Sequence, residues 1–299
     1  MLFINPTRGL FCACLAACLG ANTAAAQDLP LSMILIEGES WELVASGYKF
    51  TEGPAVDSEG NLYFSDVPNS RIHKLDAAGK VSVFVENSYS TNGLMFGPNG
   101  RLYGCQNGKQ RIVAYDRAGK ATTIAEGVES NDLVVNGAGG VYFTDPAHRR
   151  VWYVSPEGEK RVVDEGIERP NGIILWPDQG TLVVADTLGQ YLWAFRVEAD
   201  GGLKYKEPYY SARLTAGREG SGADGLTVDS AGRLYAATYA GLQVWDPTGR
   251  SCGVILKPQA AFLSNVVLAG PKLDTLYVTS TDKIYRRKTQ AAGLRYARR

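Results

Sequence analysis

Six acidic or amide residues recur along this chain at nearly constant spacing, and their side chains suit a hard cation. Successive members lie 40, 39, 40, 53 and 41 residues apart. They are Glu52, Asn92, Asn131, Asn171, Asp224 and Asn265. Each carries a carboxylate or carbonyl oxygen, the ligand type that Ca²⁺ and Mg²⁺ prefer. Because the set holds no His or Cys, we expect one divalent metal ion, Ca²⁺ first, with Mg²⁺, Mn²⁺ or catalytic Zn²⁺ left open.

A local structural role is the competing interpretation of these six residues. Asn and Asp are favoured where strands begin, because their side chains bond to nearby backbone. That role explains any one amide in the set, but it does not explain Glu52, whose longer side chain is a poor local cap. We therefore predict that the two carboxylates of Glu52 and Asp224 neutralise the ion and that the amides add neutral oxygens.

Each of the six residues opens a similar stretch of sequence. In the first repeat, a strand at 52–56 is followed by a turn at 58–61 and by strands at 62–64, 71–75 and 81–85. The turns contain Gly, Pro, Asn or Asp, and the second strands are β-branched or aromatic. A period near 40 residues with four short strands is typical of a propeller blade. The sequence therefore predicts an all-β, six-bladed β-propeller with four-stranded antiparallel blades.

The sixth repeat is one strand short, because the chain ends soon after its third strand. The segment 41–45, which precedes the first repeat, is the natural missing strand and would close the propeller. The predicted organisation is a signal peptide at 1–26, an N-terminal lead-in at 27–40, the propeller at 41–290 and a C-terminal tail at 291–299. Since first strands line the central channel of a propeller, the six side chains should converge at one mouth.

The first 26 residues have the pattern of an export signal. Arg8 ends a charged region, an apolar stretch of 13 residues runs from 9 to 21, and three alanines at 24–26 offer a cleavage site. The stretch is too short to span a bilayer, so we predict a periplasmic or secreted protein without a transmembrane helix. Cleavage before Cys18, as in a bacterial lipoprotein, is the alternative and would leave a lipid anchor.

Composition narrows the expected partners. The chain has 31 basic and 31 acidic residues, and this balance argues against nucleic acid or an acidic membrane as partner. A small-molecule substrate and a monomeric protein are the expectation. Cys105 and Cys252, which lie in separate repeats beyond the signal, are expected to be free thiols that pack as small apolar groups.

Several motifs, taken together and in order, resemble those of the senescence-marker-protein/gluconolactonase/luciferin-regenerating-enzyme-like family. They are Thr51-Glu52-Gly53-Pro54, Ser130-Asn131-Asp132, Arg169-Pro170-Asn171-Gly172, Ala223-Asp224-Gly225-Leu226, Ser264-Asn265 and Leu276-Tyr277-Val278-Thr279. The similarity covers about residues 40–287. This resemblance implies a six-bladed propeller with lactonase activity. Regucalcin-like members carry an Arg where this chain has Glu129, so the bacterial gluconolactonase branch fits better.

The resemblance also implies roles for individual residues. Glu52, Asn171 and Asp224 would bind the metal, Asn131 would be a fourth ligand or a substrate contact, and Asp224 would also be the general base. For opening of a sugar lactone or similar small lactone, the ion would polarise the ring carbonyl. Asn131 or Asn92 could donate a hydrogen bond to the developing oxyanion. His148 is a further candidate for substrate binding or proton transfer.

Two other functions are compatible with the sequence. A phosphotriesterase-type hydrolase could use the same metal site on a phosphorus centre. A non-catalytic propeller could bind a ligand and keep the ion for structure alone, since a fold does not establish an activity. The insertion at 211–223, which lengthens the fourth interval, could be a flap over the site or a surface excursion.

Overall fold

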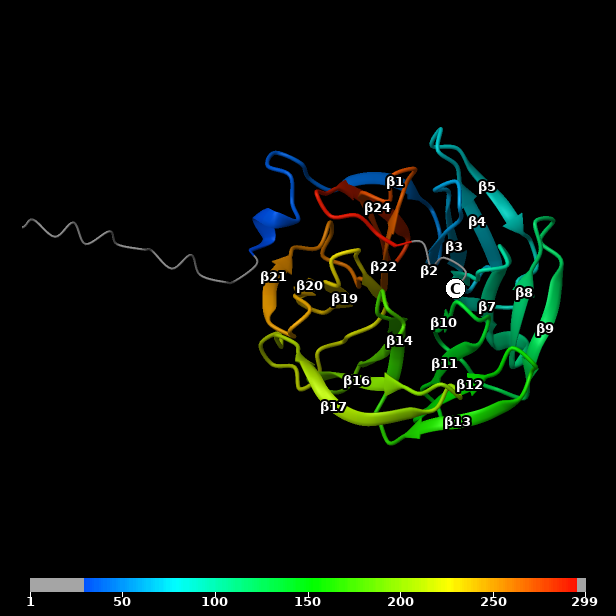
Figure 1. Ribbon diagram of the computed structural model, residues 1–299. Coiled ribbons are helices and arrows are strands. Elements are labelled where there is room, and N and C mark those ends of the chain that lie inside the picture. The colour runs from blue at the N-terminus through cyan, green and yellow to red at the C-terminus, as the bar shows by residue number, and fades with distance from the viewer. Residues whose placement is uncertain (1–29, 295–299) are drawn as a thin grey trace, which may run out of the picture.

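The computed structural model describes residues 30–294, which form six four-stranded antiparallel sheets around a central axis. The sheets follow one another around the ring in chain order, as the colour gradient of Figure 1 shows. We number them blades 1 to 6. The predicted six-bladed propeller is therefore confirmed. The predicted signal peptide and Cys18 lie outside the described residues.

The blades have the following bounds. Blade 1 comprises β2 (Thr51–Val56), β3 (Leu62–Asp66), β4 (Arg71–Leu75) and β5 (Val81–Val85). Blade 2 comprises β6 (Thr91–Phe96), β7 (Leu102–Gln106), β8 (Arg111–Tyr115) and β9 (Ala121–Glu126). Blade 3 comprises β10 (Leu133–Val135), β11 (Val141–Asp145), β12 (Arg150–Val154) and β13 (Lys160–Glu165). Blade 4 comprises β14 (Pro170–Leu175), β15 (Thr181–Asp186), β16 (Tyr191–Val197) and β17 (Leu203–Ser211).

The last two blades complete the ring. Blade 5 comprises β18 (Leu226–Val228), β19 (Leu234–Thr238), β20 (Gly241–Trp245) and β21 (Ser251–Ile255). Blade 6 comprises β22 (Asn265–Ala269), β23 (Thr275–Ser280), β24 (Lys283–Lys288) and the N-terminal β1 (Glu42–Ser46). Two short 3₁₀ helices lie at η1 (Leu31–Met33) and η2 (Asn107–Lys109). No helix within 30–294 is long and apolar enough to cross a membrane.

Blade 6 is closed by the N-terminal strand, as the sequence predicts. β1 pairs antiparallel with β24, with Glu42 opposite Arg286 and Ser46 opposite Lys283. The Trp41 indole N–H also donates to the carbonyl of Leu256, 215 residues away. Because this sheet combines both ends of the described chain, the ring cannot open without breaking a strand pair.

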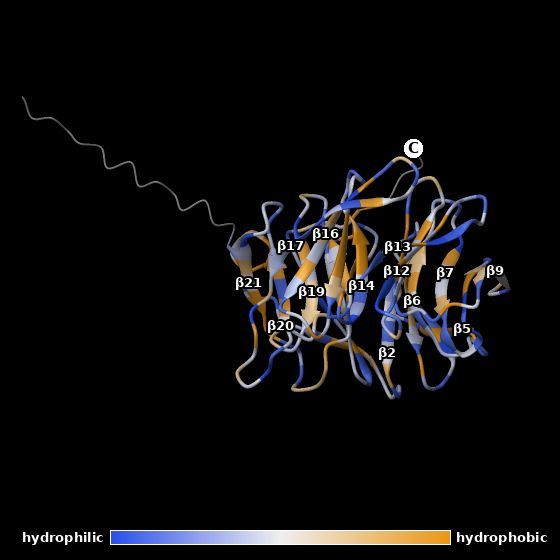
Figure 2. Cartoon of the chain, turned by 90° about the horizontal axis from the view of Figure 1, so that it is seen from below, coloured by the Kyte–Doolittle hydropathy of each residue, from blue (hydrophilic) through white to orange (hydrophobic). Residues whose placement is uncertain are grey.

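Apolar side chains fill the spaces between neighbouring blades. Between blades 6 and 1, for example, Phe64 and Leu62 pack with Tyr277 and Ile284. Fully burying such a side chain contributes about 1.5–3 kcal/mol. In Figure 2 apolar colour follows the strands through the middle of the molecule, while polar residues gather in the loops at its two ends. The blade interfaces thus hold the innermost strands at fixed positions around the channel.

A bulge at the start of each innermost strand directs one side chain toward the channel. In blade 3 the N–H of Asn131 donates to the carbonyl of Thr144 at 2.9 Å, and the N–H of Thr144 donates to Asp132 at 3.0 Å. Two residues therefore oppose one, which is the definition of a β-bulge. The same pair of bonds recurs in blade 5, where Asp224 and Gly225 oppose Ala237. Such bulges commonly re-aim side chains beside functional sites.

Both cysteines in the described residues are free, as expected. Cys105 is buried in the space between blades 2 and 3, and Cys252 is half-buried in β21. Burial raises the pKa of both thiols, so neither thiol is activated.

Candidate functional site

A closed ring of hydrogen bonds joins the six blades at the channel mouth. Each blade contributes one bond to a carbonyl of the next blade. The bonds run from Ser65 Oγ to Asn92 O (2.8 Å), Gly93 N to Asn131 O (2.9 Å), Thr144 Oγ1 to Asn171 O (2.7 Å), Thr187 Oγ1 to Ala223 O (2.9 Å), Gly225 N to Ser264 O (2.9 Å) and Ser264 Oγ to Thr51 O (2.8 Å). This ring fixes the backbone from which the predicted site residues project.

Close approach at the ring requires glycine at certain positions. Gly53 has a φ of +50°, and a Cβ there would collide with the carbonyl oxygen of Asn92 in the next blade. At Gly225 a Cβ would overlap the side chain of Asn265. These glycines let neighbouring strands meet closely enough for side chains from different blades to touch.

The prediction that Asn265 is the sixth equivalent residue was wrong by one position. The N–H of Ser264, not that of Asn265, donates to the second strand of its blade, at Thr279 O (3.0 Å), as Asn131 and Asp224 do in theirs. Ser264 is therefore the residue equivalent to the other five. Asn265 lies one step deeper, in the place that Asp132 occupies in blade 3. The two-residue bulge hid this offset in the sequence, because it admits either residue as the first of the strand.

Three buried carboxylates lie around the channel axis, in blades 1, 3 and 5, and their charges influence one another. Glu52 is 4% exposed, Asp224 is 6% exposed and Asp132 is 7% exposed. The Nδ2 of Asn265 donates to Glu52 Oε2 at 3.2 Å and to Asp132 Oδ2 at 3.3 Å, while the nearby Asn171 side chain lowers the pKa of Asp224. No ion pair among the described residues includes any of the three. Sequence reasoning missed Asp132, although its place beside Asn131 in the third repeat was a usable signal.

Burial and mutual repulsion oppose the simultaneous ionisation of Glu52, Asp132 and Asp224. Burial, reinforced by Asp132, raises the pKa of Glu52 to about 8. Burial raises the pKa of Asp132 to about 6. Burial, then Glu52 and Asp132, raise the pKa of Asp224 well above its usual range. Carboxylates this close cannot all ionise without a compensating positive charge.

The donor set around the carboxylates fits a hard divalent cation. The Oδ1 atoms of Asn92 and Asn171 are buried and have no hydrogen-bond partner, which is uncommon for a buried carbonyl oxygen. The Nδ2 of Asn171 donates to Thr187 Oγ1 at 3.0 Å, so this bond fixes the amide while its Oδ1 stays without a protein partner. Carboxylate and amide oxygens without His or Cys are the ligands of Ca²⁺ or Mg²⁺. The residues present therefore fit the predicted ion.

A polar pocket of about 470 Å³ opens on one side of the mouth, above blades 2 to 4. Its lining is Asn107, Gln110, Glu129, Ser130, Asn131, Pro146, Ala147 and Arg169. Asn131 is half-buried and lies on the pocket wall. The cationic Arg169 also acts on Asp224, because its charge lowers the pKa of that carboxyl. The pocket thus shares Asn131 with the predicted site and brings the charge of Arg169 near Asp224.

His148 lies at the outer rim rather than against the carboxylates. Its Nδ1 is 2.9 Å from Asp145 Oδ2, and its side chain is 54% exposed. One ligand atom from each of His148, Asp145 and Glu129 lies within 4.8 Å of the others. Asp145 also accepts the backbone N–H of His148 at 3.1 Å, so the pair holds the 146–148 loop. Among the described residues, the hydrogen bonds of His148 are made with Asp145 at this rim.

The insertion at 211–223 lies beside the site. The N–H of Ser221 donates to Gly189 O at 2.9 Å, and the N–H of Gly222 donates to Thr187 O at 3.0 Å. Part of the extra length lies elsewhere, because β16 and β17 form the longest hairpin, with nine residues in β17. The segment that leads to Asp224 is therefore tied down at its end.

A second cavity, of about 480 Å³, occupies the other end of the channel. It is lined by apolar residues of the innermost strands, by Gly293 and Leu294, and by charged residues such as Lys74 and Arg117. It shares Gly53, Asp132 and Asn265 with the neighbourhood of the site. None of the predicted ligands Glu52, Asn171 or Asp224 lines it. These predicted ligands therefore lie toward the opposite mouth.

Comparison with known proteins agrees with this architecture. The chain is 27% identical to the gluconolactonase of Zymomonas mobilis over 88% of this chain and 85% of that enzyme. It is 27% identical to the pentonolactonase XacC of Haloferax volcanii, over 80% of this chain and 84% of that protein. The solved structure of a gluconolactonase from Xanthomonas campestris superposes with a TM-score of 0.78 at 25% identity, over 87% of this chain and 92% of that one. Residues 50–282 match the family model of the SMP-30/gluconolactonase/LRE-like region, and the chain belongs to this family.

Proposed function

We propose that this protein is a metal-dependent hydrolase that opens a sugar lactone or a similar small lactone. The lactonase names of its relatives support the reaction class. One observation carries the metal dependence. Three buried carboxylates and two unpartnered amide oxygens meet where no cationic side chain of the described residues forms an ion pair with them. That arrangement is costly unless a divalent ion balances the charge.

Glu52, Asn171 and Asp224 would hold the ion, with Asn131 either as a fourth ligand or as a substrate contact. Ca²⁺ is the proposed metal, since every donor is an oxygen. When bound, the ion supplies positive charge that polarises a lactone carbonyl and acidifies water. The remaining chemistry belongs to side chains of this chain.

Asp224 is the proposed general base. Its carboxyl is buried, so it meets little competition from bulk water, and the nearby Asn171 side chain lowers its pKa. In its ionised form it accepts the proton of the attacking water as the new C–O bond forms. The nearby charge of Arg169 favours that ionised form.

Asn131 is the proposed substrate contact in the pocket wall. Its side-chain N–H can donate to the carbonyl oxygen as negative charge develops there. Asn92 has its Oδ1 buried and directed away from any protein partner, which suits a supporting role at the ion rather than at the substrate. His148, at the exposed rim, is proposed only as a contact for the outer part of a substrate.

The proposed place of action is outside the cytoplasm, in the periplasm or as a secreted protein. This proposal rests on the signal-like pattern of residues 1–26 in the sequence. Lipid attachment at Cys18 is the alternative, and mass spectrometry of the mature N-terminus would distinguish the two.

The function is tested with purified mature protein and a panel of substrates. After treatment with a chelator, hydrolysis of glucono-δ-lactone and of a pentonolactone should stop, and added Ca²⁺ should restore it. An organophosphate ester in the same panel should not be hydrolysed. Lactone hydrolysis that persists without any divalent ion would refute the metal dependence, and inactivity on every lactone with metal present would refute the function.

A further inference from the structure

Three aromatic rings gather on the side of the mouth that faces the polar pocket. Phe50 and Phe262 stack with their ring centroids 6.3 Å apart, and Tyr239 meets Phe262 edge-on at 5.9 Å. All three side chains are half-buried. They come from blades 1, 6 and 5, whereas the polar pocket is lined by residues of blades 2 to 4. We call Phe50, Phe262 and Tyr239 the aromatic wall.

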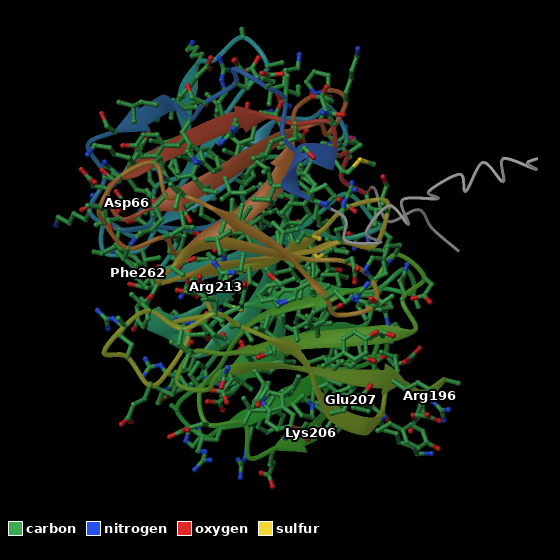
Figure 3. All side chains as sticks on the ribbon, turned by 90° about the vertical axis from the view of Figure 1, so that its left-hand side faces the viewer. Asp66, Arg196, Lys206, Glu207, Arg213 and Phe262 are labelled. Atoms are coloured by element: carbon green, nitrogen blue, oxygen red, sulfur yellow. The ribbon has the colours of Figure 1, made fainter. Side chains whose placement is uncertain are left out.

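Chain position places the aromatic wall at the same end of the innermost strands as the predicted site residues. Phe50 comes two residues before Glu52, and Phe262 comes two residues before Ser264 in the hydrogen-bonded ring. A Cβ added to Gly222, two residues before Asp224, would meet the Tyr239 ring at 2.5 Å. In Figure 3 Phe262 lies along the same edge of the molecule as Asp66. Asp66 is the last residue of β3 and pairs with Thr51, the first residue of β2. The wall is therefore on the mouth face.

The backbone beneath the wall is held rigidly. Asp66 Oδ1 accepts the N–H of Lys49 at 3.1 Å and that of Phe50 at 3.3 Å. The carbonyl of Phe262 accepts hydroxyls from Ser280 at 3.1 Å and Thr281 at 3.2 Å. These polar groups are engaged with the backbone, so they are not arranged to bind substrate hydroxyls. The groups of these two segments that remain available at the mouth are the rings of Phe50 and Phe262.

The insertion contributes one more contact to this side. The Arg218 guanidinium lies over the Tyr239 ring at 4.1 Å from its centroid, a cation–π contact. The N–H of Tyr239 donates to Ser221 O at 3.0 Å. The insertion thus contacts the wall through Arg218 and holds the backbone of Tyr239.

From this asymmetry we infer that the substrate is a lactone with an apolar substituent, which rests on the aromatic wall while the lactone oxygens face the polar pocket. The inference builds on the proposed lactonase function and narrows its substrate class. A sugar lactone such as glucono-δ-lactone would still react, but its hydroxyls on the wall side would lack partners, so a lactone with an apolar group there should react faster. An alkyl chain would bury apolar surface there at a gain of up to about 0.8 kcal/mol per methylene.

The kinetic test compares two six-membered lactones that differ only in a chain. For the Ca²⁺-loaded wild type, kcat/KM for δ-nonalactone, which carries a butyl group, should exceed that for δ-valerolactone by on the order of tenfold. Phe262→Ala and Phe50→Ala should each reduce this ratio to about threefold or less, mainly through KM. The control is Tyr205→Ala, which removes a 69% exposed ring on β17, far from the mouth, and should leave the ratio unchanged.

A binding test separates this inference from the proposed function. The corresponding lactams, 6-butyl-2-piperidone and 2-piperidone, resist hydrolysis, and calorimetry should show tighter binding of the butyl lactam by a similar factor. If no lactone is turned over but this preference is present and is lost in both Phe variants, the wall is upheld and the lactonase function fails. If lactones are hydrolysed without any preference for the chain, or if the preference survives in both folded Phe variants, the inference is overturned.

Discussion

Asn265 and Glu52, which are 213 residues apart in the chain, are joined by a hydrogen bond of 3.2 Å from Nδ2 to Oε2 at the channel axis. The same Nδ2 donates to Asp132 Oδ2 at 3.3 Å, so one amide links carboxylates from blades 1 and 3. Asn265 therefore contacts only the Oε2 atom of Glu52, and its bond does not involve Oε1. The amide therefore positions Glu52 at the mouth, although Asn265 itself lies below the ring.

Removing the Asp132 charge should stabilise the metal-free protein. Asp132 raises the pKa of both Glu52 and Asp224, so Asp132→Asn should lower the cost of ionising them. We expect the melting temperature of chelator-treated protein at pH 8 to rise, by on the order of 1 kcal/mol in stability, and Ca²⁺ affinity to fall. Asp116→Asn, in an exposed turn of blade 2, is the control. A lower melting temperature for chelated Asp132→Asn would contradict the prediction.

Metal-free protein should lose stability between about pH 4.5 and 8. The folded pKa of Glu52 is about 8, against an ordinary value of 4.5, so in this interval the folded state holds a proton that the unfolded state has released. Stability therefore falls as pH rises, by on the order of 5 kcal/mol. Circular dichroism melts with chelator at several pH values measure this loss. Glu52→Gln should flatten the profile, and added Ca²⁺ should raise the melting temperature more at pH 8 than at pH 5.

Asp224→Asn should abolish turnover while the fold stays intact. The amide is nearly the same size, so the buried site can accommodate it, but it cannot accept the proton of the attacking water. We expect kcat for glucono-δ-lactone to fall by at least about 10²-fold. The control is again Asp116→Asn, with a circular dichroism spectrum and melt for both proteins. Full activity of Asp224→Asn would exclude Asp224 as the base.

Loss of one bond in the ring between blades should affect both stability and the site. Thr144→Val removes the hydroxyl that donates to Asn171 O at 2.7 Å and leaves a buried carbonyl unsatisfied. The expected cost is about 1–3 kcal/mol in unfolding free energy. Metal affinity should weaken as well, because Asn171 is a predicted ligand.

The matched control for that substitution is Thr122→Val on the exposed strand β9. It makes the same chemical change on the outer surface of blade 2 and should alter neither stability nor affinity. Urea denaturation and Ca²⁺ titration measure both effects. Equal behaviour of the two variants would show that the ring bond contributes nothing to the site.

The blade pattern could be predicted from sequence because it is local. Turn residues such as Asp57, whose Oδ1 accepts the N–H groups of Glu59 and Asn61 at 2.9 Å each, mark where a strand reverses. Strands rich in β-branched and aromatic residues lie between such turns, and the period of about 40 residues sets the blade number. The segment 41–45 could be predicted as the closing strand because the sixth repeat lacked a fourth strand. In the structure β1 pairs with β24, as expected.

The sequence alone also determined that Glu52, Asn171 and Asp224 begin equivalent strands, because their position depends only on repeat alignment. Only the tertiary structure decided which side chains touch. In the structure Asn265 lies one layer below the other five residues of the predicted set, and Asp132 joins the site. The reason is that a bulge lets two successive residues face the channel at different depths. The tertiary structure also assembled the aromatic wall from blades 1, 5 and 6, through contacts between segments that share no repeat. Sequence periodicity encodes position around the ring, whereas depth and facing depend on how six blades pack against one another.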